Sequence, residues 1–245
     1  MKDLFKLLTE DFSIEEAVEY FKSKVPMKAS EFYKIAEEYR SLAFTVSGYT
    51  KAQVLKKFQD ELLKSIENGT TIDEFKGEMN EFLENKGYKG LTAFQADNIF
   101  RTNIQTAYQV GHYKQMTSEE VMKYRPYWQY DAVNDRRTRP SHLAMDGKVY
   151  RADDPIWDTW YPPNGFRCRC SVNTLSERQV VERGLSIEDK PPRGGEVNGV
   201  FINISPDPKF ATNPAKAVFN PDMTGYPEAL KKAFSKREDS ASKGF

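Results

Sequence analysis

The chain has 245 residues, and its 36 Lys or Arg residues balance 36 Asp or Glu residues to a formal net charge of zero. This length allows one or two domains with a buried core. The zero net charge excludes a global positive field that would draw the protein onto nucleic acid or membrane. No apolar run approaches the roughly 18 residues of a transmembrane helix, and the first residues lack the apolar core of a signal peptide. We therefore expect a soluble protein that is intracellular at synthesis.

Amphipathic helices are predicted throughout the first half of the chain. A capping box, Ser13-x-x-Glu16, opens the first helix, and Pro26 ends it. Further helices follow from the spacing of their apolar residues, over 29–44, 50–68, 71–86 and 92–116. These helices carry no grouping of catalytic residue types. The pattern therefore favours a packed helical bundle or an arm that binds a partner protein.

The periodicity changes after Pro126, where β-forming residues begin to alternate. The pattern predicts strands over 127–133, 148–150 and 170–174, a hairpin turn at 145–148, a loop over 151–167 and a short helix over 176–183. From Lys190 onward the chain is rich in Pro, Gly and Asn and has no periodicity. This composition predicts an extended arm, with a short helix over 227–236.

Together these patterns predict an α+β fold in three parts. A helical N-terminal region would span residues 1–90. A long helix would then lead into a small β-containing core over 91–189, and an extended C-terminal tail would span 190–245.

Reactive residue types are concentrated between Asp135 and Cys170. This stretch holds one of the two histidines, both cysteines and two of the three tryptophans. Cys168 and Cys170 are too close in sequence to form a disulfide without strain, so we expect free thiols in a reducing compartment. On an extended strand both sulfurs would face one side. His142 lies at the start of a hairpin that can fold against that strand.

His142, Cys168 and Cys170 are therefore candidate zinc ligands, because imidazole and thiolate are the ligands that Zn²⁺ prefers. A structural zinc site requires four ligands, and the nearby Asp135 and Asp146 are the candidates for the fourth. Asp146 is better explained by its Asp-Gly turn.

Three other interpretations remain open. The thiols can pack beneath Trp157 and Trp160, with His142 hydrogen-bonded to the backbone. A cysteine and His142 can form a nucleophile–base pair, although no third partner is evident. His142 and the Arg136–Arg139 cluster can form a nuclease-like or phosphate-binding group. His112, on the long helix, has no acidic or cysteine partner one turn away, and we expect it to be a surface or half-buried histidine.

Three blocks of residues, in a fixed order, carry a family resemblance. The first is Phe100-Arg-Thr-Asn on the long helix, the second runs from Asp135 through His142 to Asp146-Gly-Lys-Val, and the third is Pro162-Pro-Asn-Gly before Cys-Arg-Cys. The core residues of these blocks are Arg101, Thr102, Asp135, Arg137, Thr138, Asp146, Gly147, Pro163 and Gly165. Over roughly residues 93–185 the chain resembles the Mu-F-like head morphogenesis family, the minor capsid proteins of tailed phages.

The resemblance implies a minor head protein, present in few copies, that acts in the head morphogenesis of a tailed phage or prophage. Its expected partners are the portal protein, other capsid or scaffold proteins, and packaged phage DNA. No membrane and no small-molecule substrate is expected, and no nucleic-acid-binding residue is assigned. The protein would be found in the virion head, and in the host cytoplasm during assembly. It would not be an enzyme, and the alternative is a nuclease-like effector that uses His142 and the Arg136–Arg139 cluster.

Zinc is the one candidate cofactor. Many members of the family have what looks like a zinc ligand set, with a Cys-x-x-Cys pair after the Asp-x-Arg-Thr block and a histidine before the closing Cys-x-Cys. This chain departs from that set. Arg139 occupies the first cysteine position and His142 the second, while Asn164–Phe166 supplies no histidine.

Overall fold

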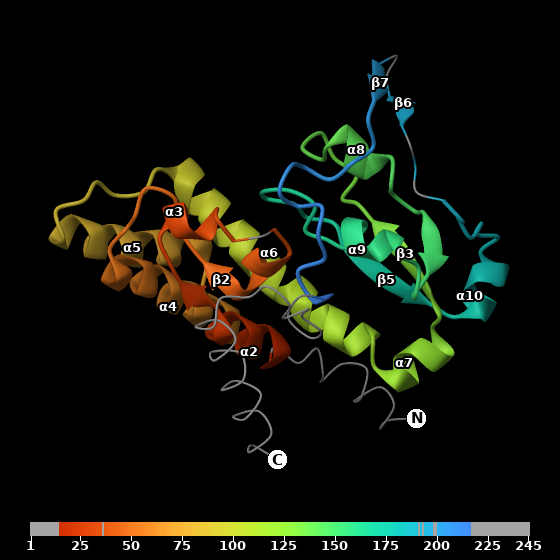
Figure 1. The fold of residues 1–245 in the computed structure, drawn as a ribbon, viewed down its shortest axis with the longest axis horizontal. Coiled ribbons are helices and arrows are strands. Elements are labelled where there is room, and N and C mark those ends of the chain that lie inside the picture. The colour runs from red at the N-terminus through yellow and green to blue at the C-terminus, as the bar shows by residue number, and fades with distance from the viewer. Residues whose placement is uncertain (1–14, 36, 191, 193, 198–199, 217–245) are drawn as a thin grey trace.

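The computed structural model describes residues 15–35, 37–190, 192, 194–197 and 200–216. Figure 1 shows a bundle of helices beside a small sheet that carries short helices, and the long helix α6 runs from one to the other. The fold is α+β, as predicted. Within the described ranges, no helix has the length and apolar character needed to cross a membrane.

Amphipathic helices form the bundle. They are α2 (Glu15–Ser23), α4 (Ala52–Asn68), α5 (Ile72–Asn85) and α6 (Ala93–Met116). Their apolar stripes meet in one core, which includes the fully buried side chains of Phe58, Leu62, Ile66, Met79 and Leu83. Capping boxes at Thr71 and Thr92 begin α5 and α6, because each threonine oxygen accepts a backbone N–H that the helix leaves unpaired. The end of α2 before Pro26 is confirmed, whereas the predicted cap Ser13 lies outside the described residues.

The predicted helix over 29–44 is wrong. The segment contains α3 (Ala29–Phe32), the 3-10 helix η1 (Glu37–Leu42) and strand β2 (Ala43–Phe44). Strand β2 pairs in parallel with β1 (Val25–Pro26), and the Met27 amide donates to the Phe44 carbonyl at 2.8 Å. Phe44 is buried in the core of the bundle. Burial and tertiary hydrogen bonds therefore override the helix-like spacing of the apolar residues.

A three-stranded antiparallel sheet forms the second part of the fold. Its central strand is β3 (Tyr127–Asp131), with β4 (Val149–Arg151) on one side and β5 (Ser171–Leu175) on the other. Trp128 and Tyr130 lie two residues apart on β3, so they point to the same face. Both are buried in a second hydrophobic core. The predicted strands are confirmed to within two residues at each end.

Short helices connect and cover the strands. They are α7 (Glu119–Tyr124), α8 (Pro140–Leu143), α9 (Ile156–Trp160) and α10 (Glu177–Glu182). Helix α10 confirms the one predicted over 176–183. Helix α9 corrects the loop predicted over 151–167, because Trp157 and Trp160 bury their rings in the sheet core by forming a helical turn. Helix α8 lies within the connection from β3 to β4, so the turn at 145–148 closes a longer loop than a tight hairpin.

The tail is not simply an extended arm. Its described part contains the antiparallel strands β6 (Gly195–Val197) and β7 (Val200–Ile202). After them the chain runs back over the molecule, where Ile204 is buried in the sheet core and Ala215 in the bundle core. The Asn213 side chain donates to the Trp157 carbonyl at 3.0 Å. The helix predicted over 227–236 lies outside the described residues, and the three-part domain division stays a prediction.

Helix α6 holds the bundle and the sheet together. The side-chain amides of Gln105 and Gln109 donate to the Cys170 carbonyl at 3.0 and 3.4 Å. The Tyr161 hydroxyl donates to the Gln109 carbonyl at 2.9 Å. These contacts fix the Cys-Arg-Cys segment, which leads into β5, against α6.

Candidate metal centre

His142, Cys168 and Cys170 meet in the interior of the protein. Nδ1 of His142, on α8, lies 3.7 Å from Sγ of Cys168 and 3.5 Å from Sγ of Cys170. The three donor atoms lie within 4.8 Å of one another, and their residues are only 1%, 3% and 1% exposed. Both thiols are free, and the ring centroid of Trp160 lies 6.3 Å from that of His142. The structure thus brings together the three residues that the sequence singled out.

This geometry fits a zinc ion. With Zn–S bonds of about 2.3 Å and Zn–N bonds of about 2.0 Å, tetrahedral coordination separates the sulfur and nitrogen atoms by roughly 3.5 Å. The observed Sγ–Nδ1 distances of 3.5 and 3.7 Å agree with that separation. The same distances also suit S···N hydrogen bonds, so a metal-free cluster of two thiols and an imidazole fits this geometry as well.

Neither predicted candidate supplies a fourth ligand. The two carboxylate oxygens of Asp135 accept from Arg169 at 2.7 and 2.6 Å. The carboxylate of Asp146 accepts from the Ala132 amide at 2.8 Å and from the Asn134 side chain at 2.7 Å. Among the described residues only three ligand atoms gather at this point. A fourth ligand would therefore come from water or from a group outside these residues.

The two thiols differ in acidity. A hydrogen bond from Cys170 and the adjacent His142 lower the pKa of the Cys168 thiol well below its usual range, although burial opposes the shift. The pKa of Cys170 is raised, because Cys170 donates that hydrogen bond, is buried and faces the neighbouring thiolate. Cys168 is therefore the more acidic of the two thiols, and thiolate is the form of cysteine that binds metals.

Asp135 and Thr138 join the loop before α8 to the Cys-Arg-Cys segment. Besides the paired contact with Asp135, Arg169 donates to the Thr138 hydroxyl at 3.2 Å. The Arg137 amide donates to the Asp135 carboxylate at 2.9 Å, and the Thr138 hydroxyl donates to the Val133 carbonyl. The Arg169 hydrogen bonds, together with that amide, hold the pKa of the Asp135 carboxyl well below its usual range. These residues act as a framework that fixes the loop to the cysteine-bearing strand.

Asp146 and Gly147 fix the return from α8 to β4. The carboxylate contacts of Asp146 tie this turn to the end of β3. The Gly147 amide donates to the Tyr130 carbonyl at 2.9 Å. Gly147 has φ +74°, in the left-handed region that glycine adopts without strain.

Gly165 lies where three segments converge. A Cβ at this position would lie 2.4 Å from Oδ2 of Asp207 and 3.0 Å from Cζ of Arg139. Those two side chains form a salt bridge of 2.8 Å, and Arg139 also donates to the Phe166 carbonyl at 3.0 Å. Only glycine leaves room for this pair. Pro163, two residues earlier, follows a cis peptide bond.

Arg101 and Thr102 connect α6 to the same loop. Arg101 pairs with Asp97 at 2.6 Å, and Arg167 pairs with the other oxygen of Asp97 at 2.5 Å. The Thr102 hydroxyl accepts from the Arg167 amide at 3.1 Å. The family-motif residues from all three blocks thus hold the loops around the cluster in place.

The nuclease-like grouping does not assemble. His142 is 1% exposed and turns toward the cysteines. Arg139 pairs with Asp207, and Arg137 lies on the exposed side of Asp135 at 3.6 Å. The structure therefore does not support a site in which His142 and these guanidinium groups act together on a nucleic-acid phosphate.

His112 has a structural role. Its Nε2 donates to the Val172 carbonyl at 3.0 Å. Burial lowers the pKa of the imidazole, although this hydrogen bond opposes the shift. The half-buried position that we expected from the sequence is confirmed, and its contact adds another link between α6 and β5.

The fold and the site define a class of protein, namely an α+β chain in which one long helix joins a helical bundle to a small sheet that encloses a buried His-Cys-Cys cluster. Comparison with known proteins shows a family that this chain resembles. Residues 56–173 match the family described as Phage Mu protein F like protein. Over this span the chain is similar to the Mu F-like family, as its three motif blocks predicted.

Two relatives show how far the similarity extends. The Mu-like prophage FluMu F protein of Haemophilus influenzae is 43% identical over 168 residues, which cover 64% of this chain and 40% of that protein. The putative capsid assembly protein F of Escherichia phage Mu is 30% identical over an alignment of 247 positions, which covers 85% of this chain and 56% of that protein. The chain therefore spans about half the length of these relatives. No solved structure matches it significantly.

Proposed function

We propose that this chain is a capsid assembly protein that acts in phage head morphogenesis. The observation that carries the proposal is its similarity, over 85% of its length, to a protein described as a putative capsid assembly protein of phage Mu. The arrangement of the site agrees with this role, because the grouped cysteine and histidine side chains are buried. They hold loops together and offer no open surface to a substrate.

The role that we infer is that of a minor head protein. It would be present in few copies, contact the portal protein and other capsid or scaffold proteins, and lie in the virion head near packaged DNA. During assembly it would be found in the host cytoplasm. Its zero formal net charge supports protein contacts as its main interactions, because non-specific DNA binding depends on a surplus of cationic side chains.

Quantitative mass spectrometry of purified heads and procapsids tests this proposal. We expect the chain in both particles, at a low and fixed ratio to the portal protein, and at the same ratio after a high-salt wash. A chain that is absent from every particle, or present only at the variable level of host contaminants, would show that it has no structural role in the head.

We also propose that His142, Cys168 and Cys170 bind one zinc ion that stabilises the loops around the cluster. The support is the thiolate–imidazole donor set and its spacing. When bound, zinc would link α8 to the segment before β5, which are otherwise joined through side-chain hydrogen bonds. Because a folded site rarely exists in the unfolded chain, zinc binding would add directly to the free energy of unfolding.

Metal analysis and thermal unfolding test the zinc proposal. We expect about one zinc per chain, a melting temperature that a strong chelator lowers, and a loss of several kcal/mol when Cys168→Ser and Cys170→Ser are combined. His112→Gln is the matched control, because it removes a half-buried histidine outside the cluster and should leave zinc content unchanged. A protein that contains no metal, and whose melting temperature does not change when the chelator is added, would instead support the hydrogen-bonded thiol cluster.

A further inference from the structure

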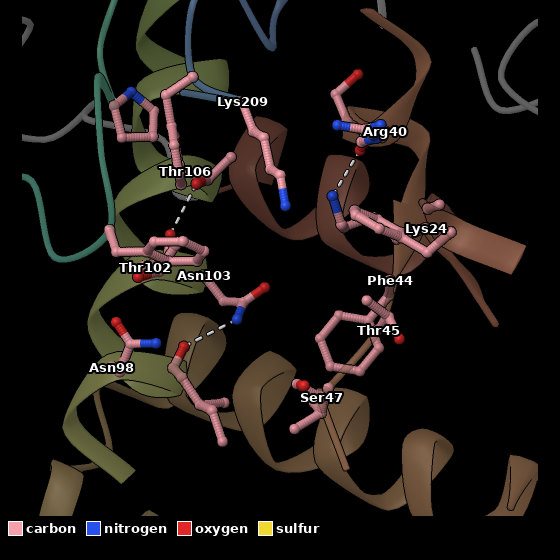
Figure 2. A pocket seen from close by; sticks show the side chains of 18 of the residues that line it. Lys24, Arg40, Phe44, Thr45, Ser47, Asn98, Thr102, Asn103, Thr106 and Lys209 are labelled. Atoms are coloured by element: carbon pink, nitrogen blue, oxygen red, sulfur yellow. Dashed lines mark hydrogen bonds between the residues drawn. The ribbon is translucent and has the colours of Figure 1, made fainter. Parts of the chain in front are cut away.

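A cavity of about 600 Å³ lies between the helical bundle and the returning tail. Figure 2 shows α6 as one wall, with the residues around β2 on the opposite side. The tail contributes Lys209 and Phe210, and ring side chains such as Phe44, Phe94 and Phe166 supply apolar surface. Ligand sites in proteins usually enclose roughly 300–1,000 Å³ and combine apolar walls with a few polar groups. The cavity has both features.

The charged side chains of the cavity are all cationic. Lys24, Arg40 and Lys209 line it, and none of the described residues that line it is Asp or Glu. Figure 2 shows the amino groups of Lys24 and Lys209 directed into the cavity from opposite walls. Among the described residues, no carboxylate lies within salt-bridge distance of either amino group. The cavity is therefore electropositive although the chain as a whole is neutral.

Lys24 is the strongest sign that a ligand belongs here. It is only 8% exposed, and its amino group donates to the Tyr20 hydroxyl at 2.9 Å and to the Ser41 carbonyl at 2.5 Å. These neutral partners satisfy hydrogen bonds, and no described residue supplies a carboxylate to balance the charge. Burial accordingly lowers the pKa of Lys24 to about 7. Lysine is almost never buried without a charged partner unless the position has a use for it.

Uncharged polar groups complete the lining. The Thr45 hydroxyl is buried and has no hydrogen-bond partner among the described residues. Asn98, Asn103 and Thr102 face the cavity from α6, and Pro163 also lines it. Thr102, Asn103 and Pro163 belong to the family-motif blocks, yet among the described residues no hydrogen bond joins any of them to the His-Cys-Cys cluster. The family-motif blocks thus supply residues both to the loops around the His-Cys-Cys cluster and to the lining of the cavity.

The chemistry of the cavity favours a carboxylate over a phosphate. Phosphate sites typically use unpaired backbone N–H groups at the start of a helix. At the start of α6, the capping box of Thr92 and Gln95 already occupies two of those groups, the backbone N–H of Thr92 and that of Gln95. Arg40 donates to the Ile35 carbonyl at 3.2 Å and does not present a free fork for a phosphate. The amino groups of Lys24 and Lys209 are separate from each other and lie among aromatic rings. This arrangement suits a peptide whose carboxylates each bind one amino group and whose apolar side chains contact the rings.

We propose that this cavity binds a short acidic peptide segment of a partner protein, with carboxylates at Lys24 and Lys209 and apolar side chains among the aromatic rings. This inference goes beyond the proposed role in head assembly. It does not depend on that role, because any partner protein with such a segment could bind in the cavity.

Selection from a displayed library of random heptapeptides tests the inference, followed by calorimetry with the selected synthetic peptides. We expect selection for Asp or Glu next to Phe or Leu. Replacing the acidic residues of a selected peptide by their amides should weaken binding roughly tenfold or more, as loss of a charged hydrogen bond does. Lys24→Met and Lys209→Met should have the same effect. Lys56→Met is the matched control, because Lys56 is exposed on α4 and pairs with Asp60.

Three results would overturn the inference. The first is a selection without enrichment of acidic residues. The second is binding that survives both cavity substitutions unchanged. The third is displacement of the selected peptides by inorganic phosphate or AMP at lower concentrations than by the acidic peptide, which would make the site one for small phosphate ligands. Because Lys209 is exposed, Lys209→Met keeps the test valid even if Lys24→Met alters the fold.

Discussion

At the scale of single residues, Lys24 makes the stability of the protein depend on pH. In the unfolded chain its pKa is near 10.5, and burial lowers it to about 7 in the folded protein. Below pH 7 the folded protein must keep a buried ammonium, and between pH 7 and 10.5 the unfolded chain binds the extra proton. The free energy of unfolding should therefore rise with pH across this window.

Lys24→Met isolates this effect. The substitution should stabilise the protein by about 5 kcal/mol at pH 6, and the gain should vanish near pH 10.5. The Ser41 carbonyl keeps a donor in the variant, because the Tyr20 hydroxyl also donates to it at 2.9 Å. Urea denaturation of both proteins at several pH values measures the difference. A gain that stays constant with pH would mean that the ammonium is not the cause.

The sequence predicted the residues of the candidate metal site but not their surroundings. His142, Cys168 and Cys170 could be named because soft ligands are rare in this chain and lie in one short stretch. Their framework could not be named, because Asp135 pairs with Arg169 across 34 residues and nothing local marks that contact. The cavity was missed for the same reason. In the sequence, Lys24 resembles any lysine at the end of a helix. Its burial depends on the residues around Ser41, which pack over it in the folded protein.

At the scale of elements, local signals succeeded where they agreed with tertiary packing. The helices predicted over 71–86 and 92–116 begin where the structure places capping boxes at Thr71 and Thr92, since a cap satisfies donors within its own turn. The segment over 29–44 has helical spacing as well, but it folds as two short helical turns and a strand. Its strand pairs with Val25–Pro26, a contact that no local periodicity contains.

The burial of the tail could not be predicted from its sequence pattern. Its Pro, Gly and Asn content predicted an arm, and the chain between Ile204 and Ala215 does lack a regular element. That segment is nevertheless part of both hydrophobic cores. The composition of the tail predicts that it has no regular element. It does not predict burial, which depends on the path of the chain after β7.

At the scale of the whole molecule, the contacts of α6 imply that the bundle and the sheet unfold together. All three tryptophans lie between Trp128 and Trp160, in the sheet core, so fluorescence reports on that part alone. Far-UV circular dichroism reports mainly on the helices of the bundle. The two signals thus follow the two parts of the fold separately, and the division at residues 90 and 91 becomes testable.

We expect the fluorescence and circular dichroism transitions in urea to coincide, because α6 belongs to the bundle core and also binds the Cys170 and Val172 carbonyls. Tyr161→Phe removes the hydroxyl that donates to the Gln109 carbonyl, and it should lower both midpoints together, by about 1 kcal/mol in unfolding free energy. Tyr124→Phe, at an exposed position, serves as the control. Midpoints that separate in the wild-type protein, or a Tyr161→Phe effect confined to fluorescence, would show instead that the bundle and the sheet are independent domains joined by a continuous helix.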